Sequence, residues 1–147
     1  MAEPWQYTIQ ERVRWGDVDA AGIIFYGAYI RFFEIAETEL FRSVGLPYTV
    51  MFEELDLWLP RRHLECDFLR PAKLDDMLEV AVCVGRVGTT SLRLEFEVRR
   101  PGNPELVATA AFVMVAVQRD HFSSTRMPPE LARRLAPYNK PGAPSLP

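Results

Sequence analysis

Residues 16–26 read GDVDAAGIIFY, and this stretch decides the fold because it separates two different hydrophobic periods. Before it, apolar residues occupy every second position of Tyr7–Trp15 with one exception, which predicts a half-buried strand of about ten residues. After it, apolar residues recur at steps of three and four over Gly27–Val44, which predicts one long helix. Gly45 is a typical helix end. The small and acidic residues between the two patterns therefore predict a loop that joins a strand to a helix.

Ile30, Phe32 and Ile35 widen the apolar stripe of the helix, so we expect this helix to be buried on most sides. Periodicity and turn residues then predict a short second helix, four strands and a last short helix: Thr49–Leu55; Trp58–Leu69, Leu78–Gly85, Leu92–Arg99 and Leu106–Val117; Glu130–Leu135. Short connections favour an antiparallel meander of the four later strands. The class is α+β, with the helix wrapped by the sheet and a free sheet edge that meets another subunit.

Composition narrows the class of protein. The 147 residues carry a net charge of −3 and fit one domain over residues 1–147, with a core at about 5–119 and a helix and loose tail over 120–147. A sequence pI near 5.4 argues against nucleic-acid binding. No apolar run approaches the roughly 20 residues of a membrane span, and the first residues lack a signal-peptide pattern. Cys66 and Cys83 lie in expected strands without metal-ligand spacing, so we expect reduced thiols and a cytoplasmic protein.

Most known catalytic motifs are absent, and no spacing predicts a metal site or a phosphate-binding glycine loop. His63 and His121 are more typical of surface or packing residues. The segment GDVDAAG allows three interpretations. It is a turn rich in Asp and Gly, or a calcium loop, or a catalytic carboxylate before a helix start. The calcium loop fails because Ala21 and Ala28 occupy two ligand positions; the other two interpretations remain open on spacing alone.

A resemblance to a known family favours the catalytic interpretation. Residues 15–29, WGDVDAAGIIFYGAY, are followed by Phe33-Glu34 and Gly45-Leu46-Pro47, and later by Arg70–Asp76 and Gly88–Leu92. Over about residues 7–119 the chain resembles the 4-hydroxybenzoyl-CoA thioesterase family of hot-dog-fold acyl-CoA thioesterases, which includes a Tol–Pal-associated branch. The resemblance implies a five-stranded antiparallel sheet wrapped around one long central helix.

The resemblance also implies roles for residues of the first motif. Asp19 would be the nucleophile or the general base, and the backbone N–H of Tyr26 would be the oxyanion donor. Gly22 would allow the bend that aims the loop. Asp17 has no catalytic role in this match, and we expect it to shape the loop. The reaction would be hydrolysis of an acyl-CoA to acid and CoA, with no metal and no cofactor beyond the CoA of the substrate.

For the acyl group, Glu34 matches a family position that faces the acyl pocket, although a solvated helix charge explains it equally well. Tyr26 matches the aroyl members better than the His of the Tol–Pal-associated branch, which favours an aromatic acyl group such as 4-hydroxybenzoyl. Phe25, Tyr29 and Trp58 would help to build its pocket.

For the CoA, the chain has Gly88-Thr89-Thr90 where the aroyl enzyme has a basic cluster. We therefore expect the CoA phosphates to be held elsewhere, by Arg61, Arg62, Arg86 or Arg126 or by backbone N–H groups. The family builds its sites at subunit interfaces, so the resemblance implies a homodimer or homotetramer.

Besides a purely structural role, which would leave the Asp19 carboxylate unexplained, three alternatives remain. The first is a thioesterase for short- or medium-chain aliphatic acyl-CoA. The second is a non-catalytic acyl-CoA-binding or sensing module that uses the same groove. The third is a hot-dog dehydratase or hydratase, which needs an acid–His pair, and no histidine lies near Asp19 in the sequence.

Overall fold

The computed structural model describes residues 2–144, so the last three residues of the expected tail, 145–147, lie outside it. The elements of the main sheet and its helix are β1 (Tyr7–Arg12), α1 (Tyr29–Ser43), β3 (Arg61–Phe68), β4 (Met77–Val87), β5 (Ser91–Arg99) and β6 (Leu106–Val115). The others are α2 (Tyr48–Glu54), β2 (Leu57–Trp58), β7 (Val117–Gln118), α3 (Pro129–Leu135) and the short 3₁₀ helices η1 (Trp15–Asp17), η2 (Tyr26–Ala28) and η3 (Ala136–Tyr138).

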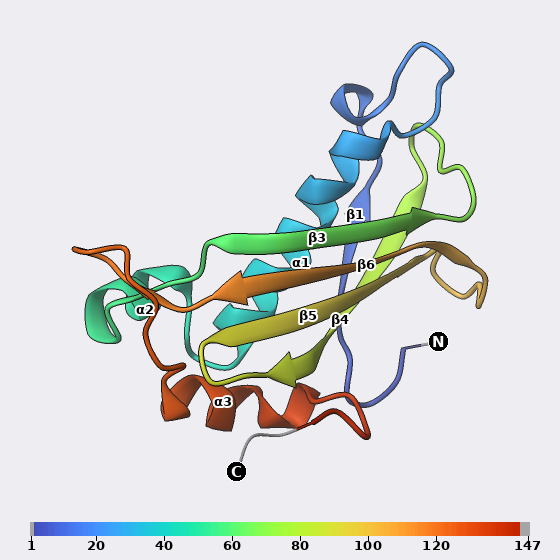
Figure 1. Ribbon diagram of the computed structural model, residues 1–147. Coiled ribbons are helices and arrows are strands. Elements are labelled where there is room, and N and C mark those ends of the chain that lie inside the picture. Colours follow the sequence, from blue (N-terminus) through green and yellow to red (C-terminus); the bar gives the residue numbers. More distant parts are fainter. Residues whose placement is uncertain (1, 145–147) are drawn as a thin grey trace.

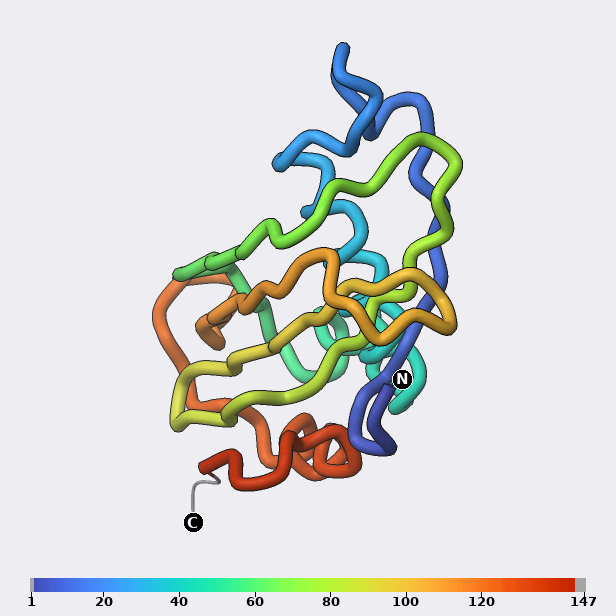
Figure 2. The backbone as a smooth tube through the Cα atoms, turned by 90° about the vertical axis from the view of Figure 1, so that its right-hand side faces the viewer, coloured from blue at the N-terminus to red at the C-terminus, as the bar shows by residue number. Residues whose placement is uncertain are grey.

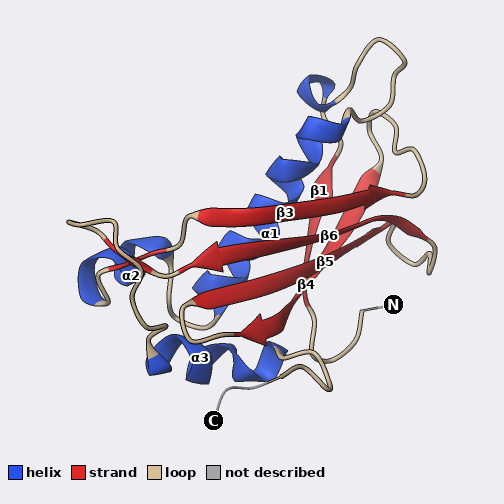
Figure 3. Cartoon of the chain, in the orientation of Figure 1, coloured by secondary structure: helices blue, strands red, loops and turns tan. Residues whose placement is uncertain are grey.

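The main sheet has five antiparallel strands in the order β1-β4-β5-β6-β3, and α1 lies across one of its faces (Figures 1 and 3). This arrangement confirms the predicted α+β class and the hot-dog architecture. The strands β4, β5 and β6 form a meander, as expected. The prediction that all four later strands do so is wrong, because β3 pairs with β6 at the far edge.

The segment that links β3 to β4 explains why β3 lies at the far edge and not beside β4. Ala72 O accepts a hydrogen bond from Ile24 N at 2.8 Å, and Lys73 forms a bridge with Ile23. These contacts hold the β3–β4 link against the loop before α1. The link therefore crosses over the ends of β5 and β6, which lie between β3 and β4 in the sheet. Sequence neighbours are often, but not always, neighbours in a sheet, and this anchored link carries the chain past two strands.

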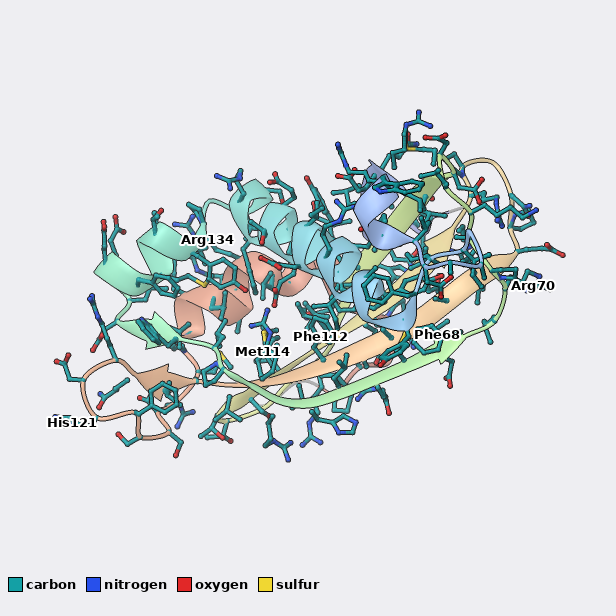
Figure 4. All side chains as sticks on the ribbon, turned by 90° about the horizontal axis from the view of Figure 1, so that it is seen from above. Phe68, Arg70, Phe112, Met114, His121 and Arg134 are labelled. Atoms are coloured by element: carbon teal, nitrogen blue, oxygen red, sulfur yellow. The ribbon has the colours of Figure 1, made fainter. Side chains whose placement is uncertain are left out.

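Aromatic packing joins α1 to the sheet. The Phe33 ring lies 5.0 Å from the Phe96 ring and 5.8 Å from the Phe112 ring, between centroids. Figure 4 shows Phe112 and Met114 of β6 on the side of the sheet that faces α1. Among residues 2–144 nothing covers the other side of α1, since Ile30 is 40% exposed and Glu34 is exposed. The prediction of a helix buried on most sides is therefore wrong, because the sheet covers only one side.

Several predicted boundaries also change. The first strand ends at Arg12, because Val13 bonds instead to Asp76 O in the β3–β4 link, and Trp15 is 81% exposed in η1. The strand expected over 58–69 is split into β2 and β3 at Pro60, which has no N–H to donate. Likewise, the strand expected over 106–117 is split into β6 and β7.

The C-terminal segment is more ordered than expected. The helix α3 confirms the predicted last helix, but the residues after it are not loose. Lys140 N donates to Val84 O at 2.9 Å, and Asn139 forms a parallel bridge with Val84 of β4. Figure 2 shows this segment lying along the end of the sheet. Cys66 and Cys83 are free cysteines, as expected from the sequence. No helix of residues 2–144 is long and apolar enough to cross a membrane.

Candidate active site

A tight hairpin, residues 18–24, precedes the helices and carries Asp19 near its tip. Val18 and Ile24 form an antiparallel bridge, and Asp19 N donates to Ile23 O at 3.1 Å. Gly22 N donates to Asp19 O at 2.9 Å, which closes the turn. Gly22 has φ +77°, and the space around its missing side chain is empty, so the turn requires glycine for its backbone angle and not for room. The structure thus contains the bend expected at Gly22.

The two aspartates of the motif have opposite environments. Asp17 is buried, and its carboxylate accepts two hydrogen bonds from Arg31, at 3.0 Å and 2.5 Å, and one from Arg14 N at 2.8 Å. Its own carbonyl accepts a hydrogen bond from Phe25 N at 3.0 Å. Asp17 therefore clamps both ends of the hairpin, in agreement with the expected loop-shaping role.

The charge of Asp17 is stabilised by these partners. Burial opposes ionisation, but the hydrogen bonds from Arg31 and from Arg14 N outweigh it and lower the pKa of the Asp17 carboxyl. Asp19 is exposed, and one of its oxygens, Oδ1, accepts a hydrogen bond from Ala21 N at 2.9 Å. Within residues 2–144 the other oxygen, Oδ2, has no hydrogen-bond partner, so it is free to act on a ligand.

The backbone N–H of Tyr26 opens the run of helix that follows the hairpin. Tyr26 is the first residue of η2, which continues directly into α1, so its N–H has no acceptor inside the helix. Among the described residues nothing outside the helix accepts from it either. A free N–H at the positive end of a helix dipole polarises a carbonyl placed against it.

Two aromatic rings, those of Phe25 and Tyr26, lie at this helix start. The Tyr26 ring is 78% exposed, and the Phe25 ring meets it edge-on at 6.4 Å between centroids. Gly27 is a residue that the sequence analysis missed. A Cβ at Gly27 would lie 2.9 Å from the Phe25 ring, so glycine is what allows this ring to fold back over the helix start. The pattern Tyr-Gly at a helix start is the only signal that the sequence offered for it.

A groove of about 590 Å³ runs along the uncovered side of α1. Its lining residues come from α1, α2, β3 and β6: Ile30, Glu34, Glu37, Tyr48, Phe52, Arg61, Leu64 and Phe112. Of the residues expected around the acyl group, the structure brings Glu34 to this groove. Phe25 lies at the helix start, whereas Tyr29 is only 3% exposed and packs in the core against Phe33. Trp58 lies on β2 against Phe52, outside the lining.

An ion pair at the far end of the groove was not foreseen. Glu37 is 0% exposed, and Arg61 donates a hydrogen bond to its Oε2. The structure thus commits Arg61, expected as a phosphate ligand, to a carboxylate of its own chain. The signal was present in the sequence, because Glu37 is an acid on the apolar stripe of the helix, and buried acids are almost always paired.

A second pocket, of about 390 Å³, lies between the β4–β5 turn and the C-terminal segment. Its lining includes Arg86 and Arg126, both expected as phosphate ligands, and also Thr89 and Arg133, which were not. Arg62 is exposed on β3 and lines neither this pocket nor the groove. Figures 1 and 2 show the hairpin and this pocket's elements at opposite ends of the molecule. His121, one of the two histidines of the chain, is exposed and lies at the opposite end of the molecule from Phe68 of β3 (Figure 4).

A five-stranded antiparallel sheet wrapped around one long helix defines the hot-dog class of proteins, and the exposed Asp19 and the free N–H of Tyr26 lie in the segment just before that helix. Residues 13–135 match the family described as the thioesterase-like superfamily, and the chain belongs to it. The predicted family and the predicted class of enzyme, a thioester hydrolase, are confirmed at this level.

Named relatives agree with this assignment. The chain is 31% identical over 126 residues to an acyl-CoA thioesterase, YbgC, of Haemophilus influenzae, covering 85% of this chain and 90% of that protein. It is 28% identical over 130 residues to a 1,4-dihydroxy-2-naphthoyl-CoA hydrolase of Synechococcus elongatus, covering 88% and 91%. Among solved structures, a 1,4-dihydroxy-2-naphthoyl-CoA thioesterase from Synechocystis superposes with a TM-score of 0.81 at 20% identity, over 89% of this chain and 96% of that one.

Proposed function

We propose that this protein hydrolyses the thioester of an acyl-CoA, with Asp19 and the N–H of Tyr26 as the reacting groups. One observation carries the proposal. The hairpin holds a carboxylate with one free oxygen close in sequence to an N–H that has no acceptor, at the start of a long helix. The names of the relatives above support the same substrate class.

In the proposed mechanism, the thioester carbonyl oxygen accepts a hydrogen bond from Tyr26 N–H. Asp19 either attacks the carbonyl carbon or takes a proton from a water that attacks it. The negative charge that forms on the carbonyl oxygen is stabilised by the N–H and the helix dipole. The carbon–sulfur bond then breaks, and CoA thiolate leaves and takes up a proton. If Asp19 attacks, a second step hydrolyses the acyl-aspartyl anhydride with water. Thiolate is a good leaving group, so we propose no metal and no further cofactor.

Two classes of acyl group are candidates. The rings of Phe25 and Tyr26 at the helix start favour an aromatic acyl group, and the naphthoyl-CoA relatives support it. The long apolar groove behind them favours an aliphatic chain instead. Glu34 on the wall of the groove fits either class.

We further propose that the active form is a homodimer or homotetramer whose sites combine two chains. The strand β4 alone is about 36 Å long, and it separates the Asp19 hairpin from the arginine pocket. We therefore propose that a CoA whose thioester lies at Asp19 extends its phosphates toward Arg86 of another chain. The strand β3 is a sheet edge with exposed Leu64 and Phe68, which suits pairing with a second copy.

On this proposal, the CoA phosphates are bound by Arg86 and Arg126 of one chain while Asp19 of another acts on the thioester. Thr89 and Arg133 line the same pocket and add a hydroxyl and a third guanidinium. Arg62 remains a further candidate on the protein surface. The free thiols Cys66 and Cys83 fit a reducing compartment, and we propose a cytoplasmic location.

The test is initial-rate thiol release from a panel of aroyl-, arylacetyl-, short-chain and long-chain acyl-CoAs, for the wild type and Asp19→Asn. Asp120→Asn, an exposed aspartate in the loop after β7, is the matched control. We expect turnover of at least one class, lost in Asp19→Asn and kept in Asp120→Asn. Tight binding of acyl-CoA without turnover across the panel would instead assign the protein to the sensing class.

A further inference from the structure

One side of the helix leads from Tyr26 to Glu37. Tyr26, Ile30, Glu34 and Glu37 are spaced by four, four and three residues, so they share one side of the continuous run of η2 and α1. The last three of them line the groove. Because the proposed function places the thioester carbonyl at Tyr26 N–H, the acyl group that follows the carbonyl extends along this side of the helix, into the groove.

The strand β3 forms the opposite wall of the groove and runs in the opposite direction to α1. The Phe68 ring, at the end of β3, lies 5.4 Å from the Tyr29 ring at the start of α1, between centroids. Arg61, at the start of β3, donates a hydrogen bond to Glu37, two turns further along α1. These two contacts place the ion pair at the end of the groove that is remote from the helix start, beside α2 (Figure 1).

The ion pair at this end is held within its own chain. Glu37 is 0% exposed, so a ligand in the groove does not reach its carboxylate. Arg61 donates to Glu37 through one terminal nitrogen and to Leu59 O through the other, at 2.8 Å. The Tyr48 hydroxyl lies within hydrogen-bonding reach of both charged side chains. What remains accessible is part of the Arg61 side chain, which is 38% exposed and lines the groove.

The chemistry of the groove therefore changes along its length. Ile30, Phe52, Leu64 and Phe112 supply apolar surface, and burying a methylene of an acyl chain against such surface is favourable. A methylene pressed against Arg61 instead removes water from a charged group and gives it no hydrogen bond in return, which costs free energy. An acyl chain thus gains affinity with each carbon until it reaches Arg61, and gains none beyond it.

We propose that the Glu37–Arg61 pair sets the maximum length of the acyl chain that the groove accepts. The inference rests on the proposed function and narrows its aliphatic substrates to short and medium chains. From Tyr29 to Glu37 the helix rises about 12 Å and an extended chain advances about 1.3 Å per carbon, so the limit falls at roughly eight to twelve carbons. Glu37 and Arg61 determine specificity on this proposal and take no part in the chemical step.

The test measures affinity as a function of chain length, by isothermal titration calorimetry on the full-length protein. The probes are non-hydrolysable 2-oxoalkyl thioether analogues of butanoyl-, octanoyl-, dodecanoyl- and hexadecanoyl-CoA, each below its micellar concentration. For the wild type we expect Kd to fall by about twofold to fourfold per added methylene from butanoyl to octanoyl. From dodecanoyl to hexadecanoyl we expect no further fall.

A double variant removes the charged wall. Glu37→Met combined with Arg61→Met replaces a buried ion pair by apolar side chains, an exchange that proteins often tolerate without loss of stability. The hexadecanoyl analogue should bind this variant at least about tenfold more tightly than the wild type, and the butanoyl analogue should bind both alike. Glu39→Met combined with Arg42→Met replaces a partly exposed pair on the same helix, outside the groove, and should leave the length dependence unchanged.

Two single variants test the charge of Arg61 and do not depend on the folding of the double variant. Arg61→Lys keeps a cation beside Glu37 and should keep the limit. Arg61→Gln leaves a neutral donor for the Glu37 carboxylate and should relax the limit, with tighter binding of the hexadecanoyl analogue than in the wild type. Circular dichroism checks that each variant is folded.

Affinity that keeps rising through hexadecanoyl in the wild type would overturn the inference, and so would a limit that Arg61→Gln leaves unchanged. Affinity that does not depend on chain length would overturn it as well, because the groove would then not hold the acyl group. Thiol release from the acyl-CoAs themselves tests the proposed function separately. A length limit in binding without hydrolysis would refute only the hydrolase, and hydrolysis without a length limit would refute only this inference.

Discussion

Asp17 and Asp19 lie two residues apart, and the structure predicts that replacing each with asparagine has a different consequence. Asp17→Asn removes the buried charge that pairs with Arg31. It also weakens the hydrogen bond that the Asp17 carboxylate accepts from Arg14 N. Loss of charged hydrogen bonds of this kind costs about 1–3 kcal/mol. Arg31 is one third exposed and regains part of its hydration, so we expect about 2 kcal/mol.

For a chain of this length, 2 kcal/mol lowers Tm by about 4–8 °C. The carbonyl of Asp17 also holds Phe25, so the hairpin shifts relative to the helix start, and kcat should fall by roughly 100-fold. Asp19→Asn should lower kcat at least as much while leaving Tm unchanged, because Asp19 is exposed and accepts only a local hydrogen bond.

The dependence on pH has a definite sign. Because the pKa of Asp17 is lowered in the folded protein, its contribution to stability is present above an ordinary carboxyl pKa of about 4 and is lost as the pH falls through the folded value. The difference in Tm between the wild type and Asp17→Asn should therefore be constant near neutral pH and shrink below about pH 4. Differential scanning calorimetry at several pH values measures it. Equal Tm for the two proteins at pH 7 would refute the clamp.

Three further predictions concern the turn at Gly22, the edge strand β3 and the arginine pocket. Gly22→Ala forces a side chain into a positive-φ position, so we expect the free energy of unfolding to fall by about 1 kcal/mol, Tm to fall by about 2–4 °C and kcat to be reduced. Gly16→Ala, at an exposed glycine without a positive φ, is the control. Leu64→Asp places a charge on the exposed edge strand and should shift the protein toward monomers in analytical ultracentrifugation; a variant with the same oligomeric state as the wild type would contradict pairing at this edge. Arg86→Ala should raise KM for acyl-CoA by about tenfold but not for the acyl-pantetheine, which lacks the nucleotide; equal effects on both substrates would exclude phosphate binding.

The sequence predicted those features that depend on local patterns. The change of hydrophobic period at residues 16–26 located the helix and the loop before it, and Gly45, with φ +78°, ends the helix region as expected. The position of β3 could not be predicted, because it depends on contacts between the β3–β4 link and the hairpin, which are distant in the sequence. The order of the C-terminal segment depends in the same way on pairing with β4.

In the candidate site, too, local patterns could be predicted from the sequence and contacts between distant segments could not. Residue types around the turn distinguished Asp17 from Asp19 only through a family resemblance, whereas the structure separates them by burial and by Arg31. Arg61 looked like a free cation on a strand, and its commitment to Glu37 depends on the approach of β3 to α1. The meeting of Arg86, Arg126 and Arg133 depends on how the C-terminal segment folds back onto the sheet.

The central claim is that the Asp19 carboxylate performs the hydrolysis. The most direct measurement compares the maximal rate of thiol release by the wild type and Asp19→Asn with the best acyl-CoA of the panel, together with the affinity of each protein for that compound. We predict a fall in kcat of about 100-fold or more, with Kd and Tm unchanged. An Asp19→Asn protein that binds and turns over the substrate like the wild type would contradict it.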